Sequence, residues 1–506
     1  PAEVRPLADG PVGRTEERPN QLSGDNPGNF AITYDLRLGE GTDGQKIKAN
    51  LDAIRTLRTL QKENRFPTPD EQRIMARYVG WGGLKSVFDT NKKDATDLYG
   101  KAQRELKELL NAREYRAANG SIRNAHYTAQ GIVDGMWRVV RHMGFNGGRA
   151  LEPTVGIGNF IGLQPADMAG STEWHAAELD AVTGHMAARL YPEANILAAT
   201  GFQDAPFADG VFDLAIGNPP FGAQTIDDKS PQRKHLSGMK IHNYIIAKAG
   251  MHLRPGGVMS MVVTHRFLDT ANPEARAELA GNFKFLGAFR LPNDAFAANA
   301  GTEVVTDVIF LQKLRDDEAR DRSASWLDVN GSINVDGADI RVNRYYQDNP
   351  THILGRSAND GTMYAGRKSE EGAPGEYTVH SDGRDLGKAI DDLISTGFKD
   401  MAGIMKRTDA DSNAAPAMLA QSDLPVGGVL LDDEGKPMPE SLSPEAQKRE
   451  AGLELRGILN KILFESLDAQ MKEAIAEAAA DPTAMQRYKA LFERRKQLGL
   501  IPQKLV

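Results

Sequence analysis

The residues with the clearest chemical potential are Asn218-Pro219-Pro220-Phe221, which follow the apolar, β-prone run 211–216. An apolar run of this length that ends in glycine is typical of a buried parallel strand, so Asn218 is expected at a strand's carboxyl end, where open α/β sheets bind ligands. The two prolines fix the backbone and remove two N–H donors, which leaves the Asn218 amide and the Pro219 carbonyl available as acceptors. With the flat ring of Phe221 beside them, these groups suit a planar ring that carries an exocyclic amine.

The tetrapeptide Asn-Pro-Pro-Phe resembles the catalytic motif of S-adenosylmethionine-dependent amino methyltransferases, and in DNA enzymes the Asn form accompanies methylation of adenine at N6. The resemblance implies that Asn218 Oδ1 and the Pro219 carbonyl accept hydrogen bonds from the amine of a flipped adenine, whose ring stacks on Phe221. Methylation of cytosine at N4 is less favoured, because that group more often has Ser before the prolines. An ordinary Pro-Pro turn after a strand is the structural alternative.

The composition limits the class of protein. A chain of 506 residues exceeds what one core holds and predicts roughly three or four domains. Its 40% hydrophobic and 26% charged residues are typical of a soluble protein, and the lack of a membrane-spanning apolar run or a signal-peptide pattern favours the cytoplasm. Zero cysteines exclude disulfides, thiolate catalysis and Cys-type zinc sites, and no metal is expected. The net charge of −8 restricts any nucleic-acid site to a local basic surface.

Between about residues 125 and 325, short apolar runs alternate with helical patterns, which predicts a doubly wound parallel sheet. Strands are expected from Arg149 and at 174–177, 195–199, 211–216, 258–263, 285–291 and 304–311, and helices at 132–143, 243–253 and 273–280. Seven strands in this order, the last two forming a reversed or hairpin pair, fit the Rossmann-like fold of S-adenosylmethionine-dependent methyltransferases.

A glycine-rich segment follows the first predicted strand. Gly156 and Gly158 allow close approach of backbone to a ligand, but Ile161 stands where a dinucleotide fingerprint has its third glycine, and no P-loop lysine follows. Glu152 would repel a pyrophosphate and suits the ammonium group of S-adenosylmethionine. The segment resembles the methylase cofactor loop, in which Glu152 faces the methionine amine. The rest of the expected wall consists of Pro153, Gly156, Gly158 and Phe160.

Two further places are expected to contact the cofactor. Tyr127 and Thr128 precede a predicted helix and resemble the motif that holds the methionine end, with Thr128 favoured and a helix cap as the alternative. Glu178 ends the second predicted strand, where a carboxylate can accept both ribose hydroxyls. Asp180 is the lesser candidate for that role, and helix N-capping is the alternative for either acid.

The resemblance places a side chain that accepts from the cofactor's adenine amine after the third strand. Gln203 and Asp204 are both candidates, because the sequence departs from the usual Asp-Phe pair. After the tetrapeptide, the loop 222–242 has a local cationic excess that could contact the phosphates of a flipped strand, with a mobile surface loop as the alternative. The predicted DNA-binding residues there are Lys229, Arg233, Lys234 and Lys240.

The flanking regions are assigned from composition and order. Residues 1–29 are expected to be a flexible leader and 30–124 an N-terminal helical region, in which Thr68 caps a helix and Trp81 is interpreted as a core anchor. The Gly-Trp-Gly-Gly segment around Trp81 resembles one in large phage and plasmid DNA methylases. The basic stretch 101–124 is interpreted as a solvated helix face, with phosphate contact as the alternative.

After the catalytic domain, which is expected to span residues 125–325, the sequence predicts two further regions. Residues 326–442 have short β-like runs among Gly, Asp and Ser and are expected to form a mixed α+β target-recognition region. Residues 443–506 are expected to form a C-terminal helical tail that packs on this region or, as a second hypothesis, makes a homodimer.

Together the motifs resemble the gamma arrangement of N6-adenine DNA methyltransferases. This resemblance implies S-adenosyl-L-methionine as cofactor, double-stranded DNA as partner, and an orphan or phage-borne enzyme with an epigenetic or anti-restriction role. RNA adenine and protein glutamine methylation are alternatives within the same chemistry. An inactive DNA-binding or phage-defence module is the alternative from another class, although intact Glu152, Gly156, Gly158, Asn218 and Phe221 weigh against it.

Overall fold

The computed structural model describes residues 22–89, 96–122, 128–272, 274–296, 304–315, 317–319, 325–361, 376–405, 417, 428–431 and 489–490. The chain divides into two compact units, 1–441 and 442–506, and the elements below belong to the first. Tyr127, the leader up to residue 21 and nearly all of the predicted tail lie outside the described residues. Homodimerisation through the tail therefore stays a prediction.

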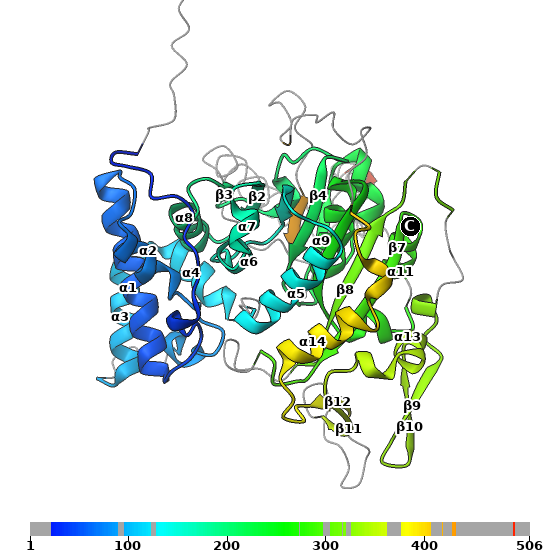
Figure 1. Cartoon of the computed structure of the whole chain (residues 1–506). Helices are drawn as coiled ribbons and strands as arrows, with labels where there is room; N and C mark the ends of the chain where they lie inside the picture. The colour runs from blue at the N-terminus through cyan, green and yellow to red at the C-terminus, as the bar shows by residue number, and fades with distance from the viewer. Residues whose placement is uncertain are drawn as a thin grey trace, which may run out of the picture. The chain divides into compact units, whose positions relative to one another are not determined.

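The first unit is organised around one seven-stranded sheet with the order β3-β2-β1-β4-β6-β8-β7 (Figure 1). Its strands are β1 (Gly148–Glu152), β2 (Thr172–Glu178), β3 (Asn195–Ala198), β4 (Phe212–Gly217), β6 (Leu253–Thr264), β7 (Phe283–Leu291) and β8 (Thr306–Lys313). All neighbours are parallel except β8, which runs antiparallel to β6 and β7. This confirms the predicted Rossmann-like methyltransferase fold with its reversed last pair. The strand order changes direction between β1 and β4, which places the ligand crevice at their carboxyl ends.

Alternate side chains of each strand enter two separate cores, as a period of two requires. Leu214 of β4 belongs to one apolar cluster and Ala215 to the other. Helices α5 (Gln130–His142), α8 (Ala181–Leu190) and α14 (Leu386–Ser395) contribute to the first cluster, and α9 (Ile241–His252) and α11 (Glu274–Ala280) to the second. The short helices α6 (Asn159–Gly162), α7 (Ala166–Ala169) and α10 (Arg266–Asp269) complete the connections. Both faces of the sheet are therefore covered.

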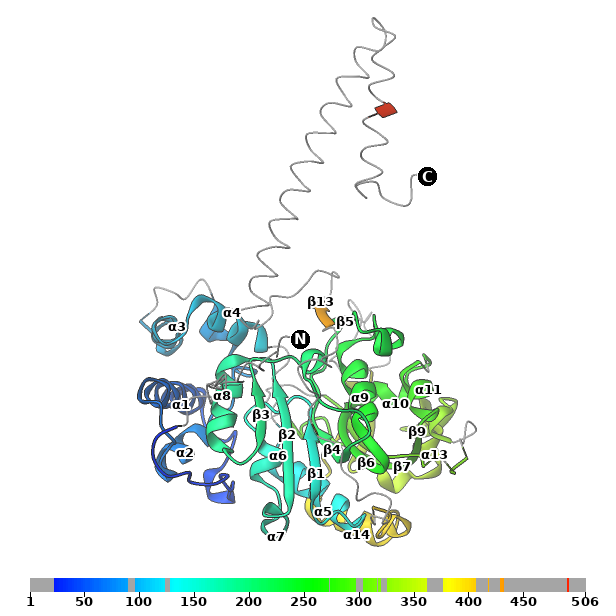
Figure 2. The same ribbon diagram turned by 90° about the horizontal axis from the view of Figure 1, so that it is seen from above.

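The N-terminal helices lie at the β3 edge of the sheet, beside α8 (Figure 2). They are α1 (Asp43–Glu63), α2 (Pro69–Ala76), α3 (Leu98–Leu109) and α4 (Ala112–Ser121). Thr68 caps α2 through a capping box with Glu71, as predicted. Trp81 is fully buried and its ring centroid lies 5.6 Å from that of Phe88, which confirms its interpretation as a core anchor. Because these apolar side chains share a cluster with the sheet, the N-terminal helices and the sheet form one core.

The basic stretch predicted over 101–124 is divided between two helices. The break falls at Asn111, whose side chain accepts hydrogen bonds from the N–H groups of Arg113 and Glu114 and so begins α4. Arg58 of α1 fixes the start of α4 by an ion pair with Glu114 at 2.6 Å. The orientation of α4 is thereby tied to the N-terminal helices.

The segment after the sheet folds back onto it. Its elements are β9 (Gly331–Val335), β10 (Ala338–Val342), α13 (Arg344–Asp348), β11 (Arg356–Gly361) and β12 (Glu376–His380), followed by α14. Helix α14 packs on α5 so closely that a Cβ on Gly135 would lie 2.4 Å from Ile390 Cδ1. Phe398 then packs edge-on against Phe310 of β8, with ring centroids 5.8 Å apart. Residues 386–405, placed by sequence order in the recognition region, are thus part of the layer that covers the catalytic sheet. No helix in the described ranges has the length and apolarity needed to cross a bilayer.

Candidate functional site

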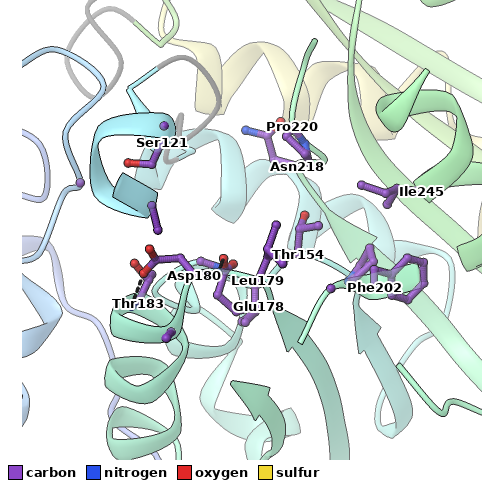
Figure 3. A pocket seen from close by; sticks show the side chains of 18 of the residues that line it. Ser121, Thr154, Glu178, Leu179, Asp180, Thr183, Phe202, Asn218, Pro220 and Ile245 are labelled. Carbon is purple, nitrogen blue, oxygen red and sulfur yellow. Dashed lines mark hydrogen bonds between the residues drawn. The ribbon is translucent and has the colours of Figure 1, made fainter. Parts of the chain in front are cut away.

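A cavity of about 380 Å³ opens at the carboxyl ends of β1, β2 and β4 (Figure 3). Ten of the candidate site residues line it: Thr128, Glu152, Pro153, Gly156, Phe160, Glu178, Asp180, Gln203, Asn218 and Pro220. The predicted residues Gly158, Asp204, Pro219 and Phe221 are described but do not belong to this lining. The structure therefore brings together the end of the first strand, the end of the second, the segment after the third and the tetrapeptide.

Glu152 is the most deeply buried acid of the cavity, with 2% of its surface exposed. Its Oε2 atom is buried and accepts no hydrogen bond from any described residue. Burial, followed by repulsion from Glu178, raises the pKa of Glu152 well above its ordinary value. A carboxyl group buried in this way ionises readily only when a cation or a hydrogen-bond donor lies beside it, so the position fits the ammonium group of a ligand such as S-adenosylmethionine.

Glu178 is held by backbone donors. Its Oε2 atom accepts from the N–H of Gly156 and its Oε1 atom from the N–H of Asp180, both at 2.8 Å. A carboxylate has about four lone-pair positions, so the group retains acceptor capacity for a ribose hydroxyl. Burial first, and then repulsion from Asp180, raises the pKa of Glu178 to about 7. Asp180 accepts from the N–H of Thr183 at 2.7 Å and caps α8, which was the alternative role considered for it.

The two glycines of the loop that follows β1 face different surroundings. The backbone φ angles of Gly156 and Gly158 are 55° and 84°, in a region that residues other than glycine rarely adopt. Gly156 lines the cavity, whereas Gly158 packs away from it, where a Cβ would lie 2.3 Å from Cε2 of Tyr191. Gly158 thus supports the loop rather than facing the ligand.

The tetrapeptide follows β4, all of whose residues are buried. Asn218 and Pro220 line the same cavity as Glu178 (Figure 3). The ring of Phe221 makes an edge contact with His242, with centroids 5.3 Å apart. Burial lowers the pKa of His242 to about 4, so its imidazole is neutral near pH 7. The strand end therefore carries an amide in the cavity and an aromatic pair next to it.

The short 3₁₀ helix η4 (Phe202–Asp204) forms another wall. Gln203 is 5% exposed and lines the cavity, whereas Asp204 is exposed and is not part of the lining. This placement favours Gln203 over Asp204 as the group nearest a ligand.

The basic loop after the tetrapeptide is folded and is not an irregular surface loop. Its strand β5 (Thr225–Asp228) pairs antiparallel with β13 (Gly428–Leu431), a partner two hundred residues away that periodicity does not indicate. Arg233, on the 3₁₀ helix η5 (Pro231–Leu236), is 5% exposed and forms an ion pair with buried Asp228 at 2.9 Å. This burial gives Arg233 a structural role and speaks against the predicted phosphate contact.

The other predicted phosphate contacts lie at the surface. Lys229 is exposed and pairs with Asp227. Lys234, within η5, and Lys240, the N-cap residue of α9, are also exposed. These lysines remain candidates for contact with an anionic partner.

Sequence reasoning missed one wall of the cavity. Tyr78 and Gly80 from the Gly-Trp-Gly-Gly region, and Arg113, Arg116 and Ser121 from α4, belong to the lining. Figure 3 shows Ser121 across the cavity from Phe202 and Ile245. Two signals in the sequence belong to this wall: the glycine-tryptophan segment, interpreted as a core anchor, and the basic stretch 101–124, interpreted as a solvated helix face. Within the described ranges, no group of three or more His, Asp or Glu side chains is placed to hold a metal ion.

Comparison with known proteins agrees with this arrangement. Residues 175–291 match the family model described as Eco57I restriction-modification methylase. This match, with the topology of the sheet, supports a methyltransferase that uses S-adenosylmethionine. The matched range includes Glu178, Gln203 and the tetrapeptide.

Among curated proteins, the chain is 25% identical over 358 residues to "Defense against restriction protein B" of Escherichia phage P1. The alignment covers 70% of this chain and 14% of that protein, so the chain corresponds to a small part of its relative. Similar solved structures include a type I restriction-modification methyltransferase subunit from Streptococcus thermophilus, which is 16% identical to this chain. The superposition covers 80% of this chain and 78% of that chain, with a TM-score of 0.37. Another is a TehB-like methyltransferase from Corynebacterium glutamicum, which is 15% identical. That superposition covers 35% of this chain and 87% of the other, with a TM-score of 0.25.

Proposed function

We propose that this chain transfers a methyl group from S-adenosylmethionine to N6 of a flipped adenine in double-stranded DNA. The observation that carries the proposal is that Asn218 lines the same cavity as Glu152 and Glu178. An acceptor suited to an exocyclic amine thus lies in one space with two acids suited to a cationic nucleoside. The match of residues 175–291 to a restriction-modification methylase model supports DNA as the substrate.

The two acids bind different parts of the cofactor. Glu152, whose Oε2 is buried without a hydrogen-bond donor among the described residues, accepts from the methionine ammonium. Glu178 accepts from the ribose hydroxyls, and Gln203 accepts from the adenine amine. Thr128, 4% exposed in the cavity wall, contacts the methionine end.

The chemistry needs positioning more than acid or base catalysis. S-adenosylmethionine, when bound, supplies an electrophilic methyl group on a sulfonium. Asn218 Oδ1 and the Pro219 carbonyl accept hydrogen bonds from N6 of the target adenine, which draws the nitrogen toward tetrahedral geometry and frees its lone pair. The nitrogen so held would attack that methyl group, the thioether sulfur would leave with both electrons of the S–C bond, and the N6 proton would pass to solvent. No covalent enzyme intermediate is required.

The target adenine must leave the duplex, which costs a few kcal/mol. Stacking on Phe221, worth about 1–3 kcal/mol for a base on an aromatic side chain, offsets this cost. Exposed Lys234 and Lys240 contact the flanking phosphates. The resemblance of the motif order to the gamma arrangement, and the name of the phage P1 relative, support a phage-borne or orphan modification enzyme with an anti-restriction or epigenetic role. Such an enzyme acts on DNA in the cytoplasm of a bacterial or infected cell.

Modification-sensitive sequencing of plasmid DNA tests the proposal. Cells that express the wild-type chain should carry N6-methyladenine in one short motif, and cells that express Asn218→Ala should carry none. The Asn218→Ala variant should still bind S-adenosylhomocysteine within about twofold of wild type, because Asn218 contacts the target and not the cofactor. Asn146→Ala, at an exposed residue between α5 and β1 and outside the cavity lining, is the matched control and should methylate normally.

Two results would contradict the proposal. Loss of cofactor affinity in Asn218→Ala with normal residual turnover would remove the role given to Asn218. No modified base with the wild-type chain, despite cofactor binding, would exclude DNA adenine and direct the same assay to RNA and to protein glutamine.

A further inference from the structure

Lys248 of α9 is completely buried beneath the cofactor wall. Its Nζ donates hydrogen bonds to the backbone carbonyls of Phe202 and Gln203, the latter at 3.1 Å. The ammonium also lies 4.7 Å from the centroid of the Phe202 ring. Burying a lysine is costly unless its donors are satisfied, so its presence here calls for a function that an apolar residue would not fulfil.

The carbonyls that Lys248 binds belong to η4, and η4 is part of the cavity. The side of η4 that carries Phe202 and Gln203 lines the cavity, while its carbonyls point back to α9. The N–H of Asp204 bonds to the carbonyl of Gly201, the N-cap of η4, at 2.9 Å, and the Phe202 ring packs edge-on against His252 of α9, with centroids 5.6 Å apart. Lys248 adds hydrogen bonds from the same helix to the backbone of η4.

One turn earlier, α9 holds the segment that follows the tetrapeptide. Tyr244 donates from its hydroxyl to Asp228 of β5 at 2.5 Å, and Arg233 donates to the same carboxylate at 2.9 Å. Tyr244 and Lys248 are four residues apart and so lie on one face of the helix. Helix α9 therefore fixes both η4 and the folded loop beyond Asn218.

We propose that Lys248 is a positioning residue that holds Phe202 and Gln203 against the adenine of the cofactor, and thereby determines how strictly the site selects an adenine nucleoside. This inference rests on the proposed function, because it takes the cavity as the S-adenosylmethionine site. It adds a residue outside the cavity lining to those that govern cofactor recognition.

The chain contains a matched control. Lys313 of β8 is also largely buried and donates to three carbonyls, those of Gly250, Met251 and Leu253, at 3.0, 3.0 and 2.7 Å. None of these groups belongs to the cavity lining. Lys248→Met and Lys313→Met thus remove the same kind of carbonyl-binding lysine, but only the first loosens η4.

Calorimetric titration of the full chain measures the effect with two ligands: S-adenosylhomocysteine and S-inosylhomocysteine, which has an oxo group in place of the adenine amine. Wild type should prefer the adenine compound. Lys248→Met should bind S-adenosylhomocysteine about tenfold more weakly and lose most of the preference. Lys313→Met should lower the melting temperature but keep affinity and preference within about twofold of wild type. Lys248→Arg, which keeps charged donors, should recover part of the preference.

The outcomes separate this inference from the function on which it rests. A Lys248→Met variant that binds both ligands in the wild-type ratio, or an equal loss in both Met variants, overturns the positioning role. If Lys248→Met does not fold, Lys248→Gln takes its place with the same expected loss of preference, because its shorter side chain does not reach the carbonyls. A wild-type chain that binds neither ligand overturns the proposed cofactor site itself, and the positioning role with it.

Discussion

The carboxylate of Glu178 accepts a hydrogen bond from the backbone N–H of Gly156 at 2.8 Å, so the acid that ends β2 also holds the glycine loop that follows β1. Burial, and then Asp180, raises the pKa of Glu178 from 4.5 to about 7. The folded chain without cofactor therefore binds more protons than the unfolded chain between these values. The stability that Glu178 contributes is fully present below the lower value and is lost as the pH rises through the upper one.

Cofactor affinity should show the opposite trend. Ribose hydroxyls donate to the ionised carboxylate, so binding of S-adenosylhomocysteine should tighten as the pH rises from about 6 to about 8 and then level off. Glu178→Gln should bind more weakly and show a flatter profile, measured by calorimetry across this range. Glu193→Gln, an exposed acid outside the cavity lining, is the control and should keep the wild-type profile. A wild-type affinity that does not change with pH would remove the ionised Glu178 from the binding step.

The glycine loop gives a second prediction. Gly158→Ala should lower the free energy of unfolding by about 2–4 kcal/mol, because the new Cβ meets Tyr191 and the backbone has positive φ. It should also weaken binding of S-adenosylhomocysteine, since the loop that carries Gly156 must shift. Urea unfolding and calorimetry measure the two effects.

Gly170 provides the comparison for this variant. It has φ of −76° and nothing within 4 Å of a built Cβ, so Gly170→Ala should change the free energy of unfolding by less than about 1 kcal/mol. Equal stability of the two variants would show that the loop yields to the added methyl group without cost.

Much of the site could be predicted because its parts lie at strand ends, and strand ends follow from short apolar runs. Glu152, Glu178 and Asn218 each end or follow such a run and therefore meet at one edge of the sheet. The wall from α4 and the pairing of β5 with β13 were missed, because they join segments far apart in sequence that no local pattern connects.

Charge in the sequence was a poor guide to exposure. Arg233 and Lys234 are neighbours in one basic loop, but the first is buried against Asp228 and the second is exposed. Nothing in the sequence indicated that Lys248 is buried, since a single lysine in an apolar helix is ordinarily expected to reach solvent. Whether a cation has an internal partner depends on tertiary contacts that composition does not contain.

The exposed lysines give the last prediction. If Lys234 and Lys240 contact phosphates, each change to alanine should reduce the slope of log affinity for duplex DNA against log salt by about 0.9. The affinity loss should be similar for cognate and unrelated duplexes, because phosphate contacts carry no sequence information. Fluorescence anisotropy at several salt concentrations measures the slope, and Lys388→Ala, an exposed lysine on α14, is the control. An unchanged slope in both lysine variants would place the DNA on another surface, since removing a phosphate contact must release fewer counterions.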